Sequence, residues 1–254
     1  MGWHSKGGHD RTFGTNAKAW DWCSVNNAGF EYYQNAKKDG IGLPPHNPRI
    51  WVFRHQSNAS CAPMLRRVWH PIGYSSNSGW SNFFINITAG RLLIYTNTLL
   101  KFALPDIVIG TGGGYNTYDI YESVNHELSH ASHFNKVGSA FWAKYVNYII
   151  TYGKKYDHPY GDASCNNSGF CGVGEMWGYA MGYIRTYEKY QQKPKNGQSK
   201  WFQPNLLYDL MTEKILTKKQ IFDCLSSDVT SHALLKQKMI SRYPSKKDSI
   251  IAKF

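Results

Sequence analysis

The sequence lacks any apolar run that approaches the roughly 18 residues needed to cross a membrane, and its apolar stretches, such as Ile107–Ile109, are no longer than a strand. No block of residues repeats at a fixed period, which excludes solenoid and propeller architectures. Charged residues are scarce at 18%, whereas hydrophobic residues make up 42% and aromatic residues 15% of the 254 positions. This composition excludes intrinsic disorder and predicts one large domain or two closely packed subdomains.

Acidic residues are in short supply: 17 Asp and Glu stand against 29 Lys and Arg, which gives a formal net charge of +12. Such an excess can attract nucleic acid, an acidic glycan or a membrane surface, or it can simply keep the surface soluble. The basic residues are dispersed, and the sequence has no zinc-finger, basic-zipper or RNA-recognition signature. We expect the charge to serve solubility, with no specific nucleic-acid partner.

Cysteine is also rare, and its odd count of five leaves at least one thiol outside intramolecular disulfides. Cys165 and Cys171 bracket a short loop and could form a disulfide or remain ordinary thiols. The high Tyr and Trp content and the low charge favour a secreted or cell-envelope protein. Because Met1–Lys6 is polar, no signal peptide is visible there, and we expect a native leader or upstream domain to be missing from this chain.

Periodicity and chain-breaking residues place all the expected strands before about residue 110 and most of the expected helices after it, a segregation that predicts an α+β fold. The expected strands are Arg49–Arg54, Phe83–Ile87, Arg91–Tyr95 and Asp106–Ile109. The expected helices are Trp20–Lys38, Pro63–Trp69, Thr117–Phe134, Ala140–Tyr152, Gly174–Tyr190, Pro204–Ile215, Thr217–Leu225 and Ser231–Tyr243. Residues 1–19 are expected to form a loose N-terminal segment, and residues 153–173 a loop.

A glycine-rich segment, Gly110–Gly114, joins an expected strand to an expected helix and suggests a nucleotide-binding loop. However, Tyr115 stands where a dinucleotide fingerprint needs its third glycine, and no Gly-Lys-Ser/Thr follows. We interpret the segment as a strand-to-helix turn that needs glycine backbone conformations.

The most informative pattern is H-E-x-x-H at His126–His130. On a helix, residues four apart lie one above the other, so the imidazoles of His126 and His130 can bind one Zn²⁺. Glu127 can then take a proton from a water on the metal. With ten His and six Glu in the chain, the pattern would arise by chance only about 0.01 times. We therefore predict a zinc site.

Such a site needs a third protein ligand, and His133 is a poor candidate. A helix rises about 1.5 Å per residue, so His133 would lie about 10 Å along the axis from His126; we expect it to line the cleft or to support the ligands. The extended motif with a third histidine is excluded, because Lys136 stands where that histidine would be.

A later glutamate is the better candidate, and Glu175 has the most supporting context. Glycines at 174, 178 and 182 would let its helix approach the H-E-x-x-H helix closely. The competing interpretation is a first-turn carboxylate that stabilises the helix N-terminus. The remaining acidic candidates are less favoured: Glu188, Glu213, and the loop residues Asp157 and Asp162.

The H-E-x-x-H helix and a glutamate helix about 45 residues later resemble the zincin metallopeptidases, in their gluzincin branch. The resemblance implies a zincin-like α+β fold, with an N-terminal mixed sheet, backing helices and the active-site helix within residues 20–138. It implies a C-terminal helical subdomain within residues 139–254 that carries the third ligand, with zinc in the cleft between them. Gly174 and Gly178-Tyr179 differ from the thermolysin-like second motif, so we expect a different, bacterial zincin family.

The resemblance also implies roles for individual residues. Asn125 is expected to be structural, and a strand within residues 83–109 is expected to pair with an extended peptide. The implied zinc ligands are His126, His130 and Glu175, the implied general base is Glu127, and the candidate oxyanion donors are Tyr179, Tyr183 and His232.

These expectations define a zinc metallopeptidase, an endopeptidase that hydrolyses peptide bonds in peptide or protein substrates through a Glu127-activated, zinc-bound water. We expect it to be a secreted or envelope protein and a monomer. The alternative is a zincin-shaped binding module that holds an anionic glycan, envelope component or host protein without turnover. The intact Glu127 favours the enzyme, because a module without turnover has no need of a general base.

Overall fold

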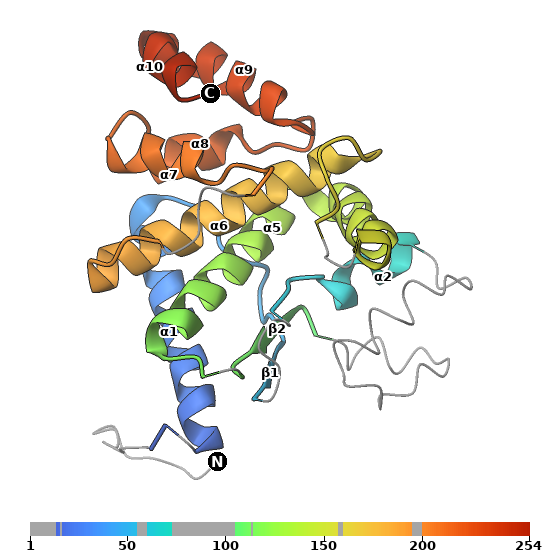
Figure 1. Cartoon of the computed structure of the whole chain (residues 1–254), viewed down its shortest axis with the longest axis vertical. Coiled ribbons are helices and arrows are strands. Elements are labelled where there is room, and N and C mark those ends of the chain that lie inside the picture. Colours follow the sequence, from blue (N-terminus) through green and yellow to red (C-terminus); the bar gives the residue numbers. More distant parts are fainter. Residues whose placement is uncertain are drawn as a thin grey trace.

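The computed structural model describes residues 14–15, 17–54, 60–72, 105–112, 114–156, 160–194 and 200–254. This part of the chain is mostly helical and contains one small parallel sheet. Figure 1 shows helices α5 and α6 side by side at the centre, with α1 against α5. Helices α7 and α8 lie next to α6, and α9, which also contacts α6, lies with α10 at one end.

The sheet consists of β1 (Ile50–Phe53) and β2 (Ile107–Gly110), which run parallel with Ile50 opposite Ile107. Cys61 adds a single antiparallel bridge to Val108. All four residues of β2 are buried, which fits the apolar sequence Ile-Val-Ile-Gly. Both strands were predicted to within one residue.

The α+β prediction therefore holds only in its coarse form: in the residues described, helices far outweigh a two-stranded sheet. The other two predicted strands, Phe83–Ile87 and Arg91–Tyr95, lie outside the described residues, as does most of the segment expected to pair with a peptide.

Helix α5 (Thr117–Tyr156) contains two segments that the sequence predicts as separate helices. Gly138 interrupts it with a non-helical backbone (φ 83°, ψ 174°), a conformation that glycine adopts at little cost. The change of direction at Gly138 matters for the site, because it turns the aromatic second segment back toward the first.

Helix α6 (Ser168–Tyr190) begins six residues before its predicted start at Gly174, so the prediction of a loop up to residue 173 was wrong. The early glycines misled the prediction, because they serve close packing and do not break the helix. A Cβ at Gly169 would overlap the carbonyl oxygen of Thr230, and one at Gly172 would lie 2.9 Å from the Trp201 ring. Glu175 therefore lies within the helix, outside its first turn.

Helix α1 (Lys18–Asp39) matches its prediction and ends at Gly40, which has φ 69° and donates its N–H to the carbonyls of Ala36 and Lys37. The helix packs against α5 through small and aromatic residues. Tyr32, fully buried, shares a 2.8 Å hydrogen bond with the Ser132 hydroxyl of α5.

The remaining helices are short. Their bounds are α2 (Leu65–Ile72), α7 (Asn205–Thr212), α8 (Lys218–Cys224), α9 (His232–Arg242), the 3-10 turn η1 (Pro244–Lys246) and α10 (Lys247–Lys253). Thr217 and Gln220 form a capping box at the start of α8, which explains why that boundary was predictable. The turn η1 and α10 were not predicted.

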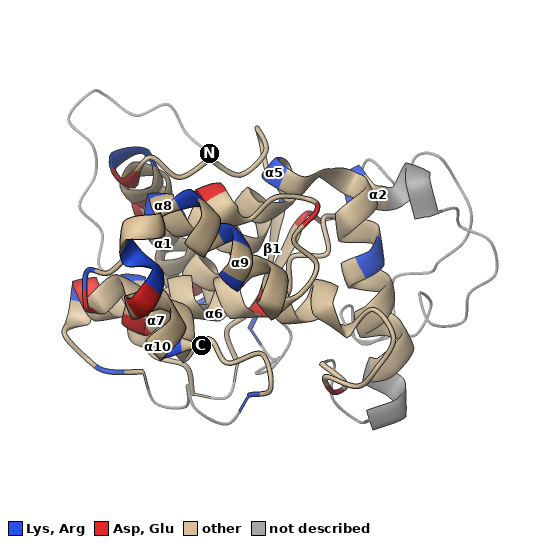
Figure 2. Ribbon diagram, turned by 90° about the horizontal axis from the view of Figure 1, so that it is seen from above, with Lys and Arg blue, Asp and Glu red and all other residues tan. Residues whose placement is uncertain are grey.

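The charge distribution, the cysteines and the length of the helices can be compared with what the sequence predicts. Lys and Arg residues are spread over several helices with Asp and Glu among them (Figure 2). No disulfide links any of the five cysteines, of which Cys171 and Cys224 are buried. Among the described helices, none has the length and apolar character needed to span a bilayer.

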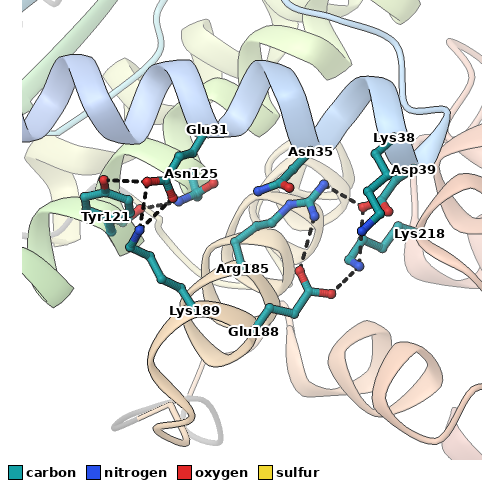
Figure 3. A pocket seen from close by; sticks show the side chains of 10 residues that line it. All are labelled: Glu31, Asn35, Lys38, Asp39, Tyr121, Asn125, Arg185, Glu188, Lys189 and Lys218. Atoms are coloured by element: carbon teal, nitrogen blue, oxygen red, sulfur yellow. Dashed lines mark hydrogen bonds and ion pairs between the residues drawn. The ribbon is translucent and has the colours of Figure 1, made fainter.

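A charged pocket with a volume of about 420 Å³ lies between α1, α5 and α6 (Figure 3). Arg185 of α6 is only 5% exposed, and its guanidinium contacts Asp39 at 2.7 Å and Glu188 at 3.2 Å. Lys218 pairs with the same two carboxylates. The charges in this part of the pocket are therefore paired with one another, and they hold α6 to the end of α1.

Replacing Arg185 with Met is expected to lower the free energy of unfolding by about 2 kcal/mol, less than the 3–5 kcal/mol for breaking a fully buried pair. The loss is smaller because Asp39 and Glu188 keep Lys218 as a partner and are partly exposed. Urea denaturation measures the change. The matched control is Lys189→Met, whose exposed pair with Glu31 should contribute less than about 1 kcal/mol. Equal effects of the two substitutions would contradict this account.

Candidate metal centre

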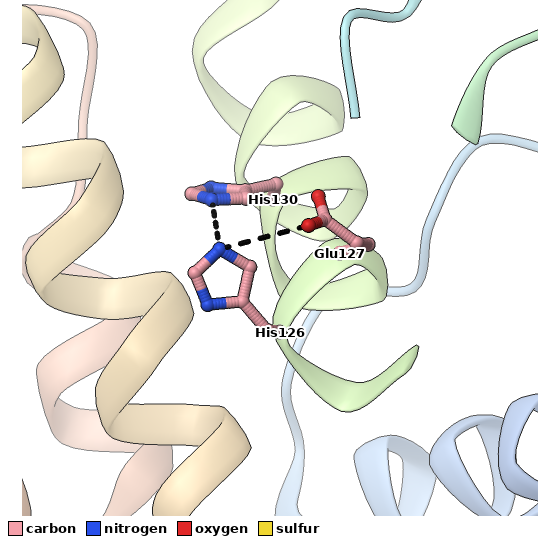
Figure 4. Close-up of side chains that lie close together, drawn as sticks. All are labelled: His126, Glu127 and His130. Carbon is pink, nitrogen blue, oxygen red and sulfur yellow. Dashed lines mark hydrogen bonds and ion pairs between the residues drawn. The ribbon is translucent and has the colours of Figure 1, made fainter. Parts of the chain in front are cut away.

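The residues of the H-E-x-x-H motif form a compact buried cluster on α5 (Figure 4). The Nε2 atoms of His126 and His130 lie 2.9 Å apart, and Oε1 of Glu127 lies 3.8 Å from Nε2 of His126. One ligand atom from each of the three residues falls within 4.8 Å of the others. The cluster therefore has the spacing of a metal site.

Glu175 reaches the same two histidines from α6. Its Oε2 lies 3.5 Å from Nε2 of His126, and its Oε1 lies 3.6 Å from Nε2 of His130. The residue is 2% exposed, so water screens these contacts little. Both imidazoles thus face one carboxylate from a second helix, and Glu127 lies beside them on their own helix.

Gly178 lets the two helices meet at this point, as the glycine spacing predicts. A Cβ at position 178 would lie 2.6 Å from Cε1 and 2.7 Å from Nε2 of His130, and 3.2 Å from Cε1 of His126. Gly174 likewise faces the ring of Tyr145. The glycines therefore make room for the imidazole rings and bring Glu175 within reach of them.

The substitution Gly178→Ala is expected to reduce zinc affinity at least about tenfold, the scale of disturbing a residue that orients a ligand. Alanine favours the helix by about 1 kcal/mol over glycine, so the fold should survive while the His130 ring is displaced. Competition with a chromogenic chelator measures the affinity. The control is Gly29→Ala on α1, where the new Cβ would meet only Leu128 at 3.8 Å. An unchanged zinc affinity in Gly178→Ala would show that zinc binding does not depend on this position of the His130 ring.

The protonation states of the cluster suit metal binding. Burial and the neighbouring His130 lower the pKa of His126 to about 4, so its imidazole is neutral at neutral pH. Burial would raise the pKa of Glu175, but the two histidines outweigh it and hold that pKa below its ordinary range. Burial and the Glu175 charge raise the pKa of Glu127 well above its usual value. Neutral imidazole and ionised carboxylate are the forms that bind metals.

Two unsatisfied atoms test whether this arrangement fits a metal. Oε2 of Glu175 is buried without a hydrogen-bond partner among the described residues, although it faces His126. A buried carboxylate oxygen of this kind is costly unless something binds it. Nδ1 of His130 also lacks a partner there, whereas metal-bound histidines generally donate that N–H. The donor set therefore fits Zn²⁺. Among the described residues, however, Nδ1 of His130 lacks the hydrogen-bond acceptor that usually orients a metal-bound histidine.

Sequence reasoning missed the aromatic residues that enclose the cluster. Tyr145, beyond the interruption at Gly138, donates a hydrogen bond from its hydroxyl to Oε1 of Glu175. The rings of Tyr145 and Trp142 both lie 5.7 Å from that of His130. The only signal in the sequence is the aromatic character of residues 140–152, which says nothing about where they fold.

Of the three predicted oxyanion donors, the structure brings only Tyr179 to the histidines. Its ring lies 4.3 Å from that of His126. Tyr183 packs against Tyr179 and Tyr208. His232 packs on Trp201, and its Nε2 has no hydrogen-bond partner among the described residues.

The other candidates take structural positions. His133 is fully buried against the rings of Phe141 and Trp142, and burial lowers its pKa to about 3. Asp162 accepts hydrogen bonds from the N–H and hydroxyl of Ser164 within a turn. Asn125 donates to the carbonyl of Tyr121, one turn earlier in α5.

Asp157 lies outside the described residues. Glu188 and Glu213 are half-exposed and pair with lysines, Lys218 and Lys253 respectively. Neither is placed beside the histidines, so Glu175 is the downstream glutamate that the structure brings to the cluster.

Comparisons of the chain with protein-family models, curated proteins and solved structures found no match. What the chain shows on its own is a buried His126-Glu127-His130 group at metal-binding distances, in a mostly helical fold.

Proposed function

We propose that the chain is a zinc-dependent metallopeptidase of the gluzincin type, an endopeptidase acting on peptides or proteins outside the cytosol or in the cell envelope. One observation carries the proposal: two imidazoles and the Glu175 carboxylate converge in a buried site, with a second carboxylate, Glu127, beside them.

The residues divide naturally between binding and chemistry. His126, His130 and Glu175 would hold the metal, a two-histidine and one-carboxylate set typical of catalytic zinc. Bound there, Zn²⁺ would lower the pKa of a coordinated water to about 7 and polarise a substrate carbonyl. Zinc is preferred over other divalent ions because imidazole ligands with an open position suit it.

Glu127 is the proposed general base. The residue is 4% exposed, and burial and the charge of Glu175 raise its pKa well above that of an ordinary carboxyl group, the direction that strengthens it as a proton acceptor. A base works best when its pKa lies near the working pH, because it can then both accept and return the proton. Glu127 would accept a proton from the attacking water and deliver it to the leaving amine.

Tyr179 is the proposed donor to the developing oxyanion. Lys200 donates to its hydroxyl at 3.0 Å, and the hydroxyl of Tyr160 lies 3.0 Å away. When Tyr160 also donates, the proton of Tyr179 remains available to a substrate oxygen. Tyr183 and His232 lack an observed contact with the histidines, so we assign them no role in the reaction.

The test is hydrolysis of a peptide library by the zinc-loaded protein, with the new termini identified by mass spectrometry. We expect cleavage that a chelator abolishes and added zinc restores. Bound zinc without cleavage of any peptide would overturn the peptidase proposal and favour a module that binds without turnover.

A further inference from the structure

Lys200, just before α7, presents its ammonium group to the aromatic residues beside the cluster. Its Nζ donates to the hydroxyl of Tyr179 at 3.0 Å. The same atom lies 4.3 Å from the ring centre of Tyr179, 5.2 Å from that of Tyr160 and 5.6 Å from that of Phe202. Aromatic faces attract a cation at these distances, so the ammonium has a defined position.

Several contacts fix this position. The indole N–H of Trp201 donates to the carbonyl of Tyr160 at 3.1 Å, and the N–H of Gln203 donates to the carbonyl of Lys200 at 2.9 Å. Phe202 is buried and stacks on the ring of Tyr179. The segment that follows Lys200 is therefore held against α6, with Trp201 beside Gly172 and Phe202 on Tyr179.

The ammonium group of Lys200 has no direct ion pair among the described residues, although the negative charges of Glu175 and Glu122 act on it. Within the described ranges, no carboxylate forms an ion pair with it, whereas Lys189, Lys218, Lys238 and Lys253 each pair with at least one. An ammonium has three N–H donors, and the hydrogen bond to Tyr179 uses one. The two remaining donors of this half-buried cation are therefore open to an incoming anion.

The cation also lies within electrostatic reach of the proposed ligands. Burial lowers the pKa of Lys200, while the negative charge of Glu175 acts in the opposite direction. The positive charge of Lys200 contributes in turn to the lowered pKa of His126. Tyr179, which contacts both Lys200 and His126, connects the two positions.

We propose that Lys200 forms a subsite that binds a carboxylate of the substrate next to the metal centre, an inference that rests on the proposed peptidase function. The carboxylate can be the free C-terminus of a peptide or the side chain of Asp or Glu. Either group would accept hydrogen bonds from the two remaining N–H donors of Lys200. The chain would then prefer peptides that carry a negative charge close to the bond that is cleaved.

Peptide binding tests the Lys200 subsite without relying on turnover. The zinc-loaded Glu127→Gln protein is incubated with three matched pools of acetylated pentapeptides, and retained peptides are quantified by mass spectrometry. The pools contain neutral side chains with a free C-terminus, neutral side chains with an amidated C-terminus, and one Glu with an amidated C-terminus. At least one carboxylate pool should be retained about tenfold more than the neutral amide pool, the scale of one hydrogen bond to a charged group.

Adding Lys200→Met to this protein should remove the preference, and Lys200→Arg should restore part of it. The matched control is Lys144→Met, which removes an exposed lysine above the ring of Phe170. Zinc content and circular dichroism establish that each variant is loaded and folded. Equal retention of all pools, no retention at all, or a preference that survives Lys200→Met would overturn the subsite.

The failure of the subsite is distinguishable from that of the peptidase function. Hydrolysis by the zinc-loaded chain without any carboxylate preference would overturn the Lys200 subsite but support the peptidase function. A Lys200-dependent binding preference without hydrolysis by the wild-type chain would overturn the peptidase function but support the Lys200 subsite.

Discussion

Replacing Glu127 by Gln is expected to slow peptide hydrolysis about a thousandfold, within the range measured for general acid–base groups, while the protein keeps its zinc. Gln has nearly the shape of Glu, so this buried position should tolerate it, but its amide cannot accept the proton of the attacking water. The rate on a cleaved library peptide and the zinc content per chain are measured on the same preparation.

A matched control is Glu213→Gln. Glu213 lies after α7, is half-exposed and pairs with Lys253, so its substitution should leave both the rate and the zinc content unchanged. If Glu127→Gln hydrolysed peptides at the wild-type rate, the assignment of the base would be wrong. If it lost its zinc, Glu127 would be a ligand instead.

The variant Glu175→Ala is expected to weaken zinc binding at least about 100-fold, because changes to residues that merely orient ligands already cost 10- to 100-fold. Glu175 faces both imidazoles at 3.5 Å and 3.6 Å, whereas the ion-pair contact of Glu127 is with His126, at 3.8 Å. The geometry therefore favours Glu175 as the third ligand, and chelator competition measures the loss.

Two further variants separate ligand loss from packing loss. Glu175→Gln keeps the side-chain volume and the hydrogen bond from Tyr145 but removes the charge, so it should still weaken zinc binding markedly. Glu188→Ala changes a half-exposed glutamate of the same helix that lies away from the histidines, and it should leave zinc affinity unchanged. Wild-type affinity in both Glu175 variants would exclude Glu175 as a ligand.

The core of the site is predictable because it depends on local geometry. Histidines four apart on one helix face the same way whatever surrounds them, and the structure places His126 and His130 accordingly. The glycine spacing also carried information about tertiary contacts. Gly178 predicts a close approach of two helices, and the imidazoles lie where its side chain would have been.

The surroundings of the site were not predictable, because they depend on how distant segments fold together. Tyr145 reaches Glu175 only because the chain changes direction at Gly138, and no local pattern specifies that direction. Lys200 lies at the end of a polar stretch that resembles an ordinary linker. Its role as a neighbour of Tyr179 appears only once Trp201 and Phe202 are packed.

Glycine was the main source of error in the fold. Near the start of α6, the sequence Ser-Gly-Phe-Cys-Gly-Val resembles a loop, since glycine weakens a helix by about 1 kcal/mol per residue relative to alanine. The contacts of Gly169 with Thr230 and of Gly172 with Trp201 outweigh that preference. The same correction removes the interpretation of Glu175 as a first-turn carboxylate, because the helix begins at Ser168.

The most direct test of the central claim is the metal content of the protein, measured by mass spectrometry after purification without a metal-affinity column or chelator. The account predicts about one zinc per chain, the stoichiometry of a single catalytic site, and its loss in His126→Ala. A folded wild-type protein that contains no zinc and takes up none when zinc is added would contradict the account.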